Sequence, residues 1–475
     1  MAATARAAGW VLLTEIVQKL SALGFVVLVA RDLGPRSFGY YAFAFALFPL
    51  VLVVGSGIDS IVLRDVARDP SHEVARRIRD ALRLRLAAGV VGLLLAAAVG
   101  TAFVPLGKPY AALVLIGVAL LCDQLSSLLL GFFIVFERPR VYALGTTANS
   151  VLTLGFAVAA VAAGGSLVAV AAAYLAGSAA ALTIATAFLA RRVRFAERQR
   201  SSDVRELARR SAPLGLAAFL STGSLRIDTV MLAGFSGPVV VALYNVAYRF
   251  FESTLFVAWA VAKAALPAMA RASVAADRVR MFEVLIFALL SAYLPLAVLA
   301  PFAGRWILIG VFSAEYADAA RVLTVMAASA SFYALAHLSR TAAISIGVRR
   351  GIVYVAAAAF TFNVGANLIV IPAYGFVGAA WTTLATEVVE AAGFALLFVR
   401  AAALPRAGVF VAPLVASAAT AGLLSAVGAR DAAAIGLAAV AYPPFLLIAG
   451  RSLAPSATTA LLSILGAFGR RLRHA

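Results

Sequence analysis

Charged side chains stand inside an apolar run of this sequence that has the length of a membrane-spanning helix. The run YNVAYRFFESTLFVAWAVAK, residues 244–263, contains Arg249, Glu252 and Lys263. At about 100° per residue, six side chains share one narrow helix face: Asn245, Arg249, Glu252, Phe256, Trp259 and Lys263. Ionisable residues in spanning segments are rare and normally face a bundle interior or a water-filled cavity. The spacing therefore predicts a polar stripe that presents cations to an anionic ligand.

Other apolar runs carry ionisable residues as well, and these divide into cations and acids. Fixed cations would replace the hydration that an anion loses in a low-dielectric slab, whereas buried acids would pair with the cations or hold a coupling ion. The candidate cavity cations are Lys19, Arg226, Arg249, Arg321, Lys263 and Arg340. The candidate coupling or charge-pairing acids are Glu15, Asp123, Asp228, Glu252, Glu387 and Glu390.

Some of these charges have simpler explanations, which the sequence leaves open. Arg249 and Glu252 at i,i+3, like Glu15 and Lys19 at i,i+4, are spaced to neutralise each other. Lys263 lies near a predicted helix end and can extend to lipid headgroups. The chain has one cysteine and three histidines. Because no cluster of metal-ligating residues occurs in the sequence, we expect no metal site.

The composition is typical of a polytopic α-helical membrane protein. Of 475 residues, 64% are hydrophobic, and the mean hydropathy is +1.00, whereas soluble domains are about 45–50% apolar. Apolar runs of twenty or so residues recur from end to end, each long enough to cross a hydrocarbon core of about 30 Å. We expect fourteen spans, near 9–30, 38–61, 86–106, 110–136, 141–163, 166–190, 213–234, 239–263, 282–303, 317–345, 352–372, 376–399, 408–428 and 432–450.

Basic residues are distributed unevenly between alternate loops. The formal charge is +19, and most of the basic residues outside the spans lie on one side of the expected topology. The other side holds only Arg31, Arg36, Lys108, Arg305 and Arg430. The positive-inside rule then places both termini and the basic loops in the cytoplasm. Because no stacking aromatics accompany the basic runs, we expect contact with anionic membrane lipids and no binding of nucleic acid.

A shift of 203 residues brings two parts of the chain into register. Gly34-Pro35 falls on Gly237-Pro238, and Tyr41 falls on Tyr244. Residues 1–200 and 201–400 each hold six expected spans, and an even number gives both the same orientation, which predicts parallel repeats with a site between them. We expect an N-lobe at 1–200, a C-lobe at 201–400, and two further spans with a basic cytoplasmic tail at 401–475. The charged segment 191–212 is predicted to be a surface helix that joins the lobes.

Three segments of the sequence, taken together, match the pattern of a known family. They are KLSALGFVVLVARDLGPRSFGYYAFAFAL, LRIDTVMLAGFSGPVVVALYNVAYRF and NVGANLIVIPAYGFVGAAWTTLATE. They resemble the first two helices, the seventh and eighth helices, and a helix–turn–helix of the polysaccharide flippases, in the multidrug/oligosaccharidyl-lipid/polysaccharide exporter superfamily. The resemblance covers about residues 9–400 and implies two six-helix lobes around a V-shaped central cavity. In the third segment Pro372 and Gly375 form a turn, so this motif identifies the fold and marks no site.

The resemblance also implies a function. An undecaprenyl-pyrophosphate-linked oligosaccharide would move from the cytoplasmic to the periplasmic leaflet by alternating access, for surface polysaccharide biosynthesis. The setting would be the bacterial cytoplasmic (inner) membrane. We expect no cofactor, coupling to H+, Na+ or the membrane potential, and a glycan polymerase and glycosyltransferases as partners. Six residues would line the path of the glycan or pack in the interior: Tyr40, Tyr41, Tyr244, Asn245, Tyr248 and Trp259.

Three other functions stay open on the sequence alone. A peptidoglycan-precursor flippase would handle the same pyrophosphate, and a cation-coupled multidrug antiporter belongs to the same superfamily. A cationic drug, however, would be repelled by cavity cations, and fourteen spans fit the polysaccharide and peptidoglycan-precursor branches better. A membrane glycosyltransferase or polymerase needs a sizeable outer loop or a catalytic loop, and the sequence has short outer loops and no phosphate-cradling motif. We therefore expect no enzyme activity.

Overall fold

The chain is built from helices throughout the residues that the structure describes. The computed structural model describes residues 2–68, 74–193, 204–348 and 350–473, and no strand occurs within these ranges. The α-helices up to residue 271 are α1 Ala2–Leu52, α2 Ser56–Arg68, α3 Val74–Gly100, α4 Lys108–Val135, α5 Pro139–Ala162, α6 Leu167–Ala190, α7 Val204–Ser236 and α8 Pro238–Arg271. The others are α9 Ala275–Val311, α10 Ala320–Ser345, α11 Arg350–Ala401, α12 Gly408–Val427, α13 Asp431–Leu453 and α14 Pro455–Arg473. Short 3-10 turns lie at η1 Val53–Gly55 and η2 Ala314–Ala319.

Two of these helices, α1 and α11, are folded back on themselves. Twelve of the described helical segments are long and apolar enough to cross a membrane, but α1 and α11 run for 51 and 52 residues. A straight helix of that length would measure roughly 77 Å, more than twice a hydrocarbon core of about 30 Å. Gly34 (φ 72°) and Gly375 (φ 59°) break the helical path. The described helices therefore contain fourteen apolar segments, as the sequence predicts.

Side-chain contacts across each break show that the chain reverses there. The rings of Phe25 and Tyr41 stack with their centroids 5.5 Å apart, although sixteen residues of straight helix would separate them by about 24 Å. Across the second break the Nδ2 atom of Asn363 donates a hydrogen bond to Thr386 Oγ1 at 3.1 Å. Each long helix is thus an antiparallel hairpin of two spans.

The Gly-Pro pair that the 203-residue shift brings into register forms the same turn at both of its positions. Gly34 and Gly237 have φ of 72° and 79°, and in each case a helical segment continues from the proline that follows. Positive φ costs glycine nothing and other residues about 1–2 kcal/mol, which explains the glycine at both turns. The matched turns of the 203-residue shift are confirmed, whereas the relation between the complete lobes stays a prediction.

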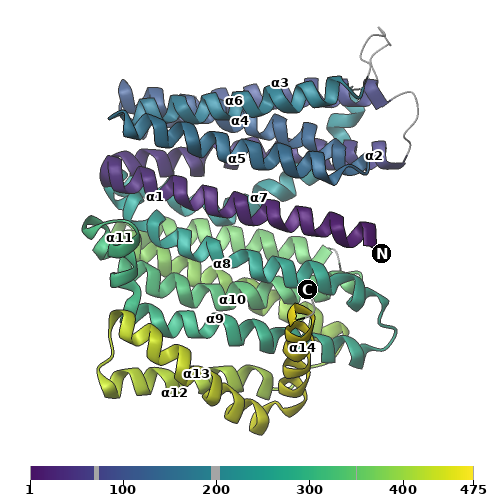
Figure 1. Cartoon of the computed structure of the whole chain (residues 1–475), viewed down its shortest axis with the longest axis vertical. Coiled ribbons are helices and arrows are strands. Elements are labelled where there is room, and N and C mark those ends of the chain that lie inside the picture. Colours follow the sequence, from purple (N-terminus) through teal and green to yellow (C-terminus); the bar gives the residue numbers. More distant parts are fainter. Residues whose placement is uncertain (1, 69–73, 194–203, 349, 474–475) are drawn as a thin grey trace. The chain divides into compact units, whose positions relative to one another are not determined.

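Contacts divide the chain into two compact units, Met1–Ala242 and Leu243–Ala475. In the first unit α3, α4, α5 and α6 pack side by side, and α7 packs on α1 and α2 (Figure 1). In the second unit α9 packs on α10, α12 and α13, and α10 packs on α11. The lobe boundaries at residues 200 and 400 stay a prediction. Of the proposed connecting helix, residues 194–203 lie outside the described residues, and residues 204–212 form the start of α7.

Helix α7 approaches α2 closely because both helices carry glycine at the contact. A Cβ on Gly57 would meet the carbonyl oxygen of Ser211 and the backbone of Gly215. Small residues allow such close approach between spanning helices. Beside this contact, Arg210 Nη2 of α7 lies 2.9 Å from Asp65 Oδ2 of α2. Glycine packing and an ion pair together hold the N-terminal part of α7 against α2.

A buried arginine links α2, α3 and α4. Arg85 is 4% exposed, and its Nε lies 3.2 Å from Asp59 Oδ1. Its Nη1 donates to the carbonyl oxygen of Leu52 at 3.0 Å, where η1 interrupts the helix, and its Nη2 donates to Gln124. A Cβ on Gly55 would collide with the guanidinium. The sequence placed the start of this span at residue 86, which was too late. The helix α3 already begins at Val74 and carries the paired cation Arg85 inside the bundle.

The expected C-terminal spans are present as α12 and α13. The residues after them, expected only as a basic tail, form the helix α14. Figure 1 shows α14 running across the direction of α12 and α13. The apolar residues Leu462, Ile464 and Leu465 of α14 are about half exposed, as on a helix that lies along a membrane surface.

Loss of Arg85 should destabilise the protein, because it leaves the Asp59 carboxylate without its partner in a low-dielectric interior. We expect Arg85→Leu to cost about 3–5 kcal/mol and the double variant Asp59→Leu/Arg85→Leu to cost less, since it leaves no charge unpaired. Thermal unfolding in detergent measures both. Arg83→Leu, two residues away and exposed, is the control and should change stability by no more than about 0.5 kcal/mol. Equal losses in Arg83→Leu and Arg85→Leu would refute this role.

Candidate functional site

Asp123 of α4 lies in a polar and aromatic cluster inside the first unit. Its carboxylate accepts hydrogen bonds from Asn149 Nδ2 of α5 at 3.1 Å and from the Tyr174 hydroxyl of α6 at 2.7 Å. Phe25 packs edge-on against Tyr174 at 5.3 Å and stacks on Tyr41 at 5.5 Å. The structure therefore brings two predicted site residues, Asp123 and Tyr41, into one cluster formed by the four helices α1, α4, α5 and α6.

The chemistry of this cluster differs from that of a structural ion pair. Within the described residues the hydrogen bonds to Asp123 come from neutral donors, and no basic side chain pairs with it. A carboxyl group without a basic partner inside a bundle can take up a proton or a small cation, and such residues mark ion pathways. Asn149 and Tyr174 were missed from sequence because neither residue is charged at neutral pH, and only the fold brings them to Asp123.

The stripe on α8 contains a real ion pair. Arg249 Nη1 lies 2.7 Å from Glu252 Oε2, and the two side chains are 16% and 25% exposed. This pairing is the simpler of the two explanations that the sequence left open. It does not use all of the guanidinium, because the buried Nε of Arg249 has no hydrogen-bond partner in the described chain. This nitrogen is enclosed by the protein, so the contact of Arg249 with a ligand stays a prediction.

The tyrosines of α8 are packed inside the second unit. Tyr244 is fully buried, its hydroxyl lies 3.1 Å from Thr383 Oγ1 of α11, and its ring stacks on Tyr248 at 5.9 Å. Asn245 is 2% exposed. These contacts agree with the interior-packing alternative for the three residues, so a role on a glycan path stays a prediction.

A cluster of aromatic and charged groups joins α8, α10 and α11. The indole of Trp259 donates a hydrogen bond to the Tyr333 hydroxyl, and Tyr333 stacks on His337 at 5.7 Å. The charges of Arg340 and Glu390 interact with each other, and both, together with Glu387, act on Tyr333. Trp259 is thus a predicted site residue that contacts this cluster, and the charges of three others, Arg340, Glu387 and Glu390, reach Tyr333. Sequence reasoning missed Tyr333, whose spacing from His337 is that of any interior helix face.

A ladder of buried amides and hydroxyls holds the α11 hairpin. Asn367 Nδ2 donates to Asn363 Oδ1 at 3.1 Å, and Asn363 donates to Thr386, as described above. Both asparagines are fully buried. The sequence identified this segment by its turn and gave no reason to connect Asn363 with Thr386, which are twenty-three residues apart.

The other predicted residues have varied surroundings. Lys19, Lys263 and Arg321 are exposed, and Arg321, which was expected among the cavity cations, is only the second residue of α10. Arg226 is half-buried and Asp228 is 2% exposed, both on α7. The side chain of Glu15 lies outside the described part of the structure, so its pairing with Lys19 stays a prediction.

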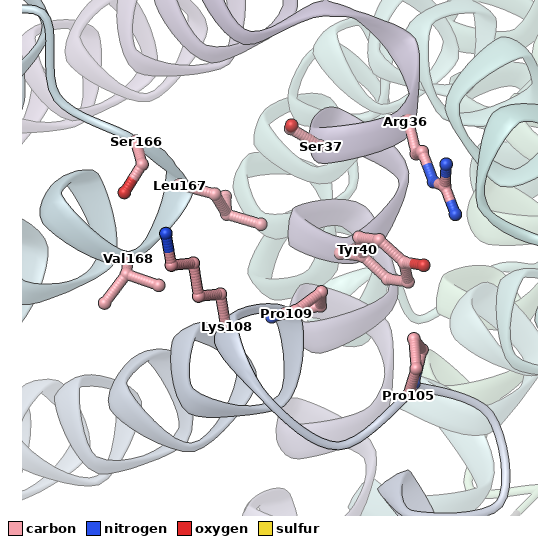
Figure 2. Close-up of a pocket in the computed structure, with 9 residues that line it drawn as sticks. All are labelled: Arg36, Ser37, Tyr40, Pro105, Lys108, Pro109, Ser166, Leu167 and Val168. Carbon is pink, nitrogen blue, oxygen red and sulfur yellow. The ribbon is translucent and has the colours of Figure 1, made fainter.

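Tyr40 lies in a pocket of about 280 Å³ at one end of the first unit (Figure 2). The pocket lies between α1, the loop before α4, and the α5–α6 turn. Its lining residues are Arg36, Ser37, Tyr40, Pro105, Lys108, Pro109, Ser166, Leu167 and Val168. No residue near the proposed stripe on α8 contributes to it.

Comparisons with known proteins agree with the fold. A family model described as "Polysaccharide biosynthesis protein" matches residues 4–273, and a second, described as "MatE", matches residues 213–369. A search of curated proteins finds no match. A solved structure described as "Lipid II flippase MurJ, inward closed conformation" superposes with a TM-score of 0.76 at 13% identity, over 93% of this chain and 99% of that one.

Drug transporters share the fold as well. An inward-facing multidrug-resistance MATE transporter of the MOP superfamily superposes with a TM-score of 0.62 at 16% identity, over 81% of this chain and 94% of that one. An outward-facing MATE structure gives 0.59 at 18% identity, over 84% and 95%. Since the polysaccharide biosynthesis model matches more than half of the sequence, the chain belongs to the polysaccharide biosynthesis protein family of the multidrug/oligosaccharidyl-lipid/polysaccharide exporter superfamily.

Proposed function

We propose that this protein flips an undecaprenyl-pyrophosphate-linked oligosaccharide from the cytoplasmic to the outer leaflet for surface polysaccharide biosynthesis. The observation that carries the proposal is the family match over residues 4–273, which includes the cations Lys19, Arg226 and Arg249 inside the spanning helices. The protein acts in the bacterial inner membrane with both termini in the cytoplasm. It performs no chemical conversion, and its partners are the membrane lipids, a glycan polymerase and glycosyltransferases.

The pyrophosphate is the part of this substrate that most needs the protein. A diphosphate loses its hydration in a low-dielectric slab, and charge-assisted hydrogen bonds from fixed cations replace it. Arg249 suits this role because Glu252 orients its guanidinium through one nitrogen while the Nε donor has no partner in the described chain. Lys19 and Arg321, which have no acidic partner among the described residues, add positive charge along the route.

In this proposal an acidic residue couples transport to the binding of an ion. Asp123 binds a proton or a sodium ion, with Asn149 and Tyr174 as further oxygen ligands or donors. A carboxylate with neutral neighbours accepts either ion, and the membrane potential adds to the driving force.

Alternating access needs a contact that closes one end of the protein and then releases it. The contact between α2 and α7 has this character. The Asp65–Arg210 ion pair is only moderately buried, with side chains 25% and 39% exposed, and ion pairs of this kind contribute about 0–1 kcal/mol. By the proposed topology it lies at the cytoplasmic end, so its release opens the path to the cytoplasm.

A peptidoglycan-precursor flippase is the second candidate, and one observation favours it. The MurJ structure covers 93% of this chain with a TM-score of 0.76, and its substrate by description is lipid II. At 13% identity this likeness concerns the fold, and both lipid substrates share the pyrophosphate that the cations would meet. A multidrug antiporter fits less well, because Lys19, Arg249 and Arg321 would repel a cationic drug.

Variants of the α8 ion pair separate a substrate contact from simple charge neutralisation. We expect Arg249→Gln to slow transfer of a fluorescent lipid-linked oligosaccharide across proteoliposomes by about tenfold or more, since a hydrogen bond between charged groups contributes about 1.5–3 kcal/mol. The double variant Arg249→Gln/Glu252→Gln leaves no unpaired charge and should stay equally slow. Glu252→Gln alone should be the mildest of the three.

Recovery of the wild-type rate in that double variant would mean that Arg249 serves only to neutralise Glu252. If Arg249→Gln and Lys19→Gln insert and accumulate normally and both transfer the substrate at the normal rate, the assignment of these cations to the substrate cavity is refuted.

Spin labels on α2 and α7 test the closing contact. Ser60 and Arg209 are exposed positions on these helices, and the distance between their labels distinguishes a closed from an open cytoplasmic end. We expect Asp65→Asn to reduce the closed population about two- to fivefold, and the exchanged pair Asp65→Arg/Arg210→Asp to restore it. Arg205→Gln, which removes a cation from the same end of α7, is the control. A closed population that is unchanged in Asp65→Asn contradicts the proposal.

A further inference from the structure

Two cations without an acidic partner line the pocket at one end of the first unit. Arg36 belongs to α1, and Lys108 is the first residue of α4. Neither forms an ion pair within the described residues. The volume of about 280 Å³ is close to the lower limit of small-molecule pockets, about 300 Å³. The pocket therefore has room for a small charged group and not for an oligosaccharide.

Two helices begin at this pocket with their first amides uncapped. Gly107 and Ser166 are the N-cap residues of α4 and α6, and neither helix start receives a side-chain hydrogen bond from its cap. Leu167 and Val168, the first two residues of α6, line the pocket. The free N–H groups of a helix start carry partial positive charge and attract anions. Both helix ends therefore add to the positive potential of the two cations.

An unpartnered hydroxyl on a buried side chain points to a ligand independently of these charges. Tyr40 is 8% exposed, lines the pocket, and makes no hydrogen bond within the described chain. A tyrosine that is this deeply buried usually has a hydrogen-bond partner for its hydroxyl. Figure 2 shows the Tyr40 hydroxyl on the same side as the Arg36 guanidinium, whereas the Lys108 ammonium is directed toward Ser166 and Val168. The Tyr40 hydroxyl and the Arg36 guanidinium thus lie together at one side of the pocket and the Lys108 ammonium at the other, and a ligand oxygen would satisfy Tyr40.

We propose that this pocket binds a phosphate group. The pocket offers an arginine, a lysine, a tyrosine hydroxyl and two helix starts. Their positive charge and their number of hydrogen-bond donors exceed what a single carboxylate satisfies, and they suit the several oxygens of a phosphate. Such a group reaches the pocket as a lipid headgroup or as free phosphate or pyrophosphate. By the proposed topology the pocket lies at the outer end, where it receives the pyrophosphate after crossing. That placement rests on the proposed function, whereas phosphate binding does not.

Binding of inorganic pyrophosphate to the purified full-length protein in detergent tests the site by calorimetry. We expect Arg36→Gln and Lys108→Gln each to raise Kd about tenfold or more, and Tyr40→Phe to raise it about fivefold. Arg31→Gln removes one exposed cation from the same end of the unit but outside the pocket, and it should raise Kd less than twofold. The melting temperature of each variant confirms that it is folded.

A second arm identifies the source of the phosphate. Retention of phosphatidylglycerol by the delipidated protein, measured by native mass spectrometry, should fall in Arg36→Gln and Lys108→Gln if the ligand is a headgroup. If the two variants lose binding of free pyrophosphate but retain the lipid, the ligand is soluble. Unchanged binding of both ligands in the pocket variants, or an equal loss in Arg31→Gln, overturns the proposal. Because neither arm measures transport, failure of flipping in the wild type would reject the proposed function and leave the pocket assignment intact.

Discussion

The hydrocarbon core of a bilayer contains no water, so polar groups of the spanning helices need partners inside the protein. This constraint explains the polar contacts between distant residues. Arg85 satisfies the Leu52 carbonyl where η1 interrupts the helix, and Asp59 balances its charge. The Asn363–Thr386 bond holds the α11 hairpin closed. Each contact lets a helix break or turn within the bundle without leaving a donor or acceptor exposed to lipid.

Groups that escape this rule mark the functional regions. The Nε of Arg249 is buried without a partner, and the Tyr40 hydroxyl has none within the described chain. The exposed cations Arg36 and Lys108, which line the pocket beside Tyr40, form no ion pair among the described residues. Asp123 has only neutral neighbours. A protein that handles an anion and a coupling ion needs open donors for the one and an unpaired acid for the other. Both kinds of group are present, in separate clusters.

Much of the fold follows from the sequence because apolar length and Gly-Pro turns are local signals. Fourteen apolar segments and the matched turns at Gly34 and Gly237 were predictable for this reason. The position of α3 was not, because a hydropathy window ends at a charge, whereas Arg85 is paired inside the bundle. The helical form of α14 was also missed, since its apolar run is too short to span.

The candidate site was less predictable, because its partners come from different helices. Helical spacing predicted the Arg249–Glu252 pair as an alternative, but the neighbours of Asp123 and Trp259 depend on tertiary packing. Periodicity on one helix cannot show which neighbouring helix covers a face. For the same reason it assigned Tyr244 equally to a glycan path and to the interior, where the structure packs it against Thr383.

The central claim is that fixed cations carry a lipid-linked pyrophosphate across the membrane. The most direct measurement compares two fluorescent substrates in proteoliposomes of the unmodified protein, one with the pyrophosphate and one with an uncharged linker between the same lipid and glycan. The account predicts transfer of the first well above protein-free vesicles and transfer of the second at least about tenfold slower. Equal rates for the two substrates, or no transfer of the first beyond the background, would contradict it.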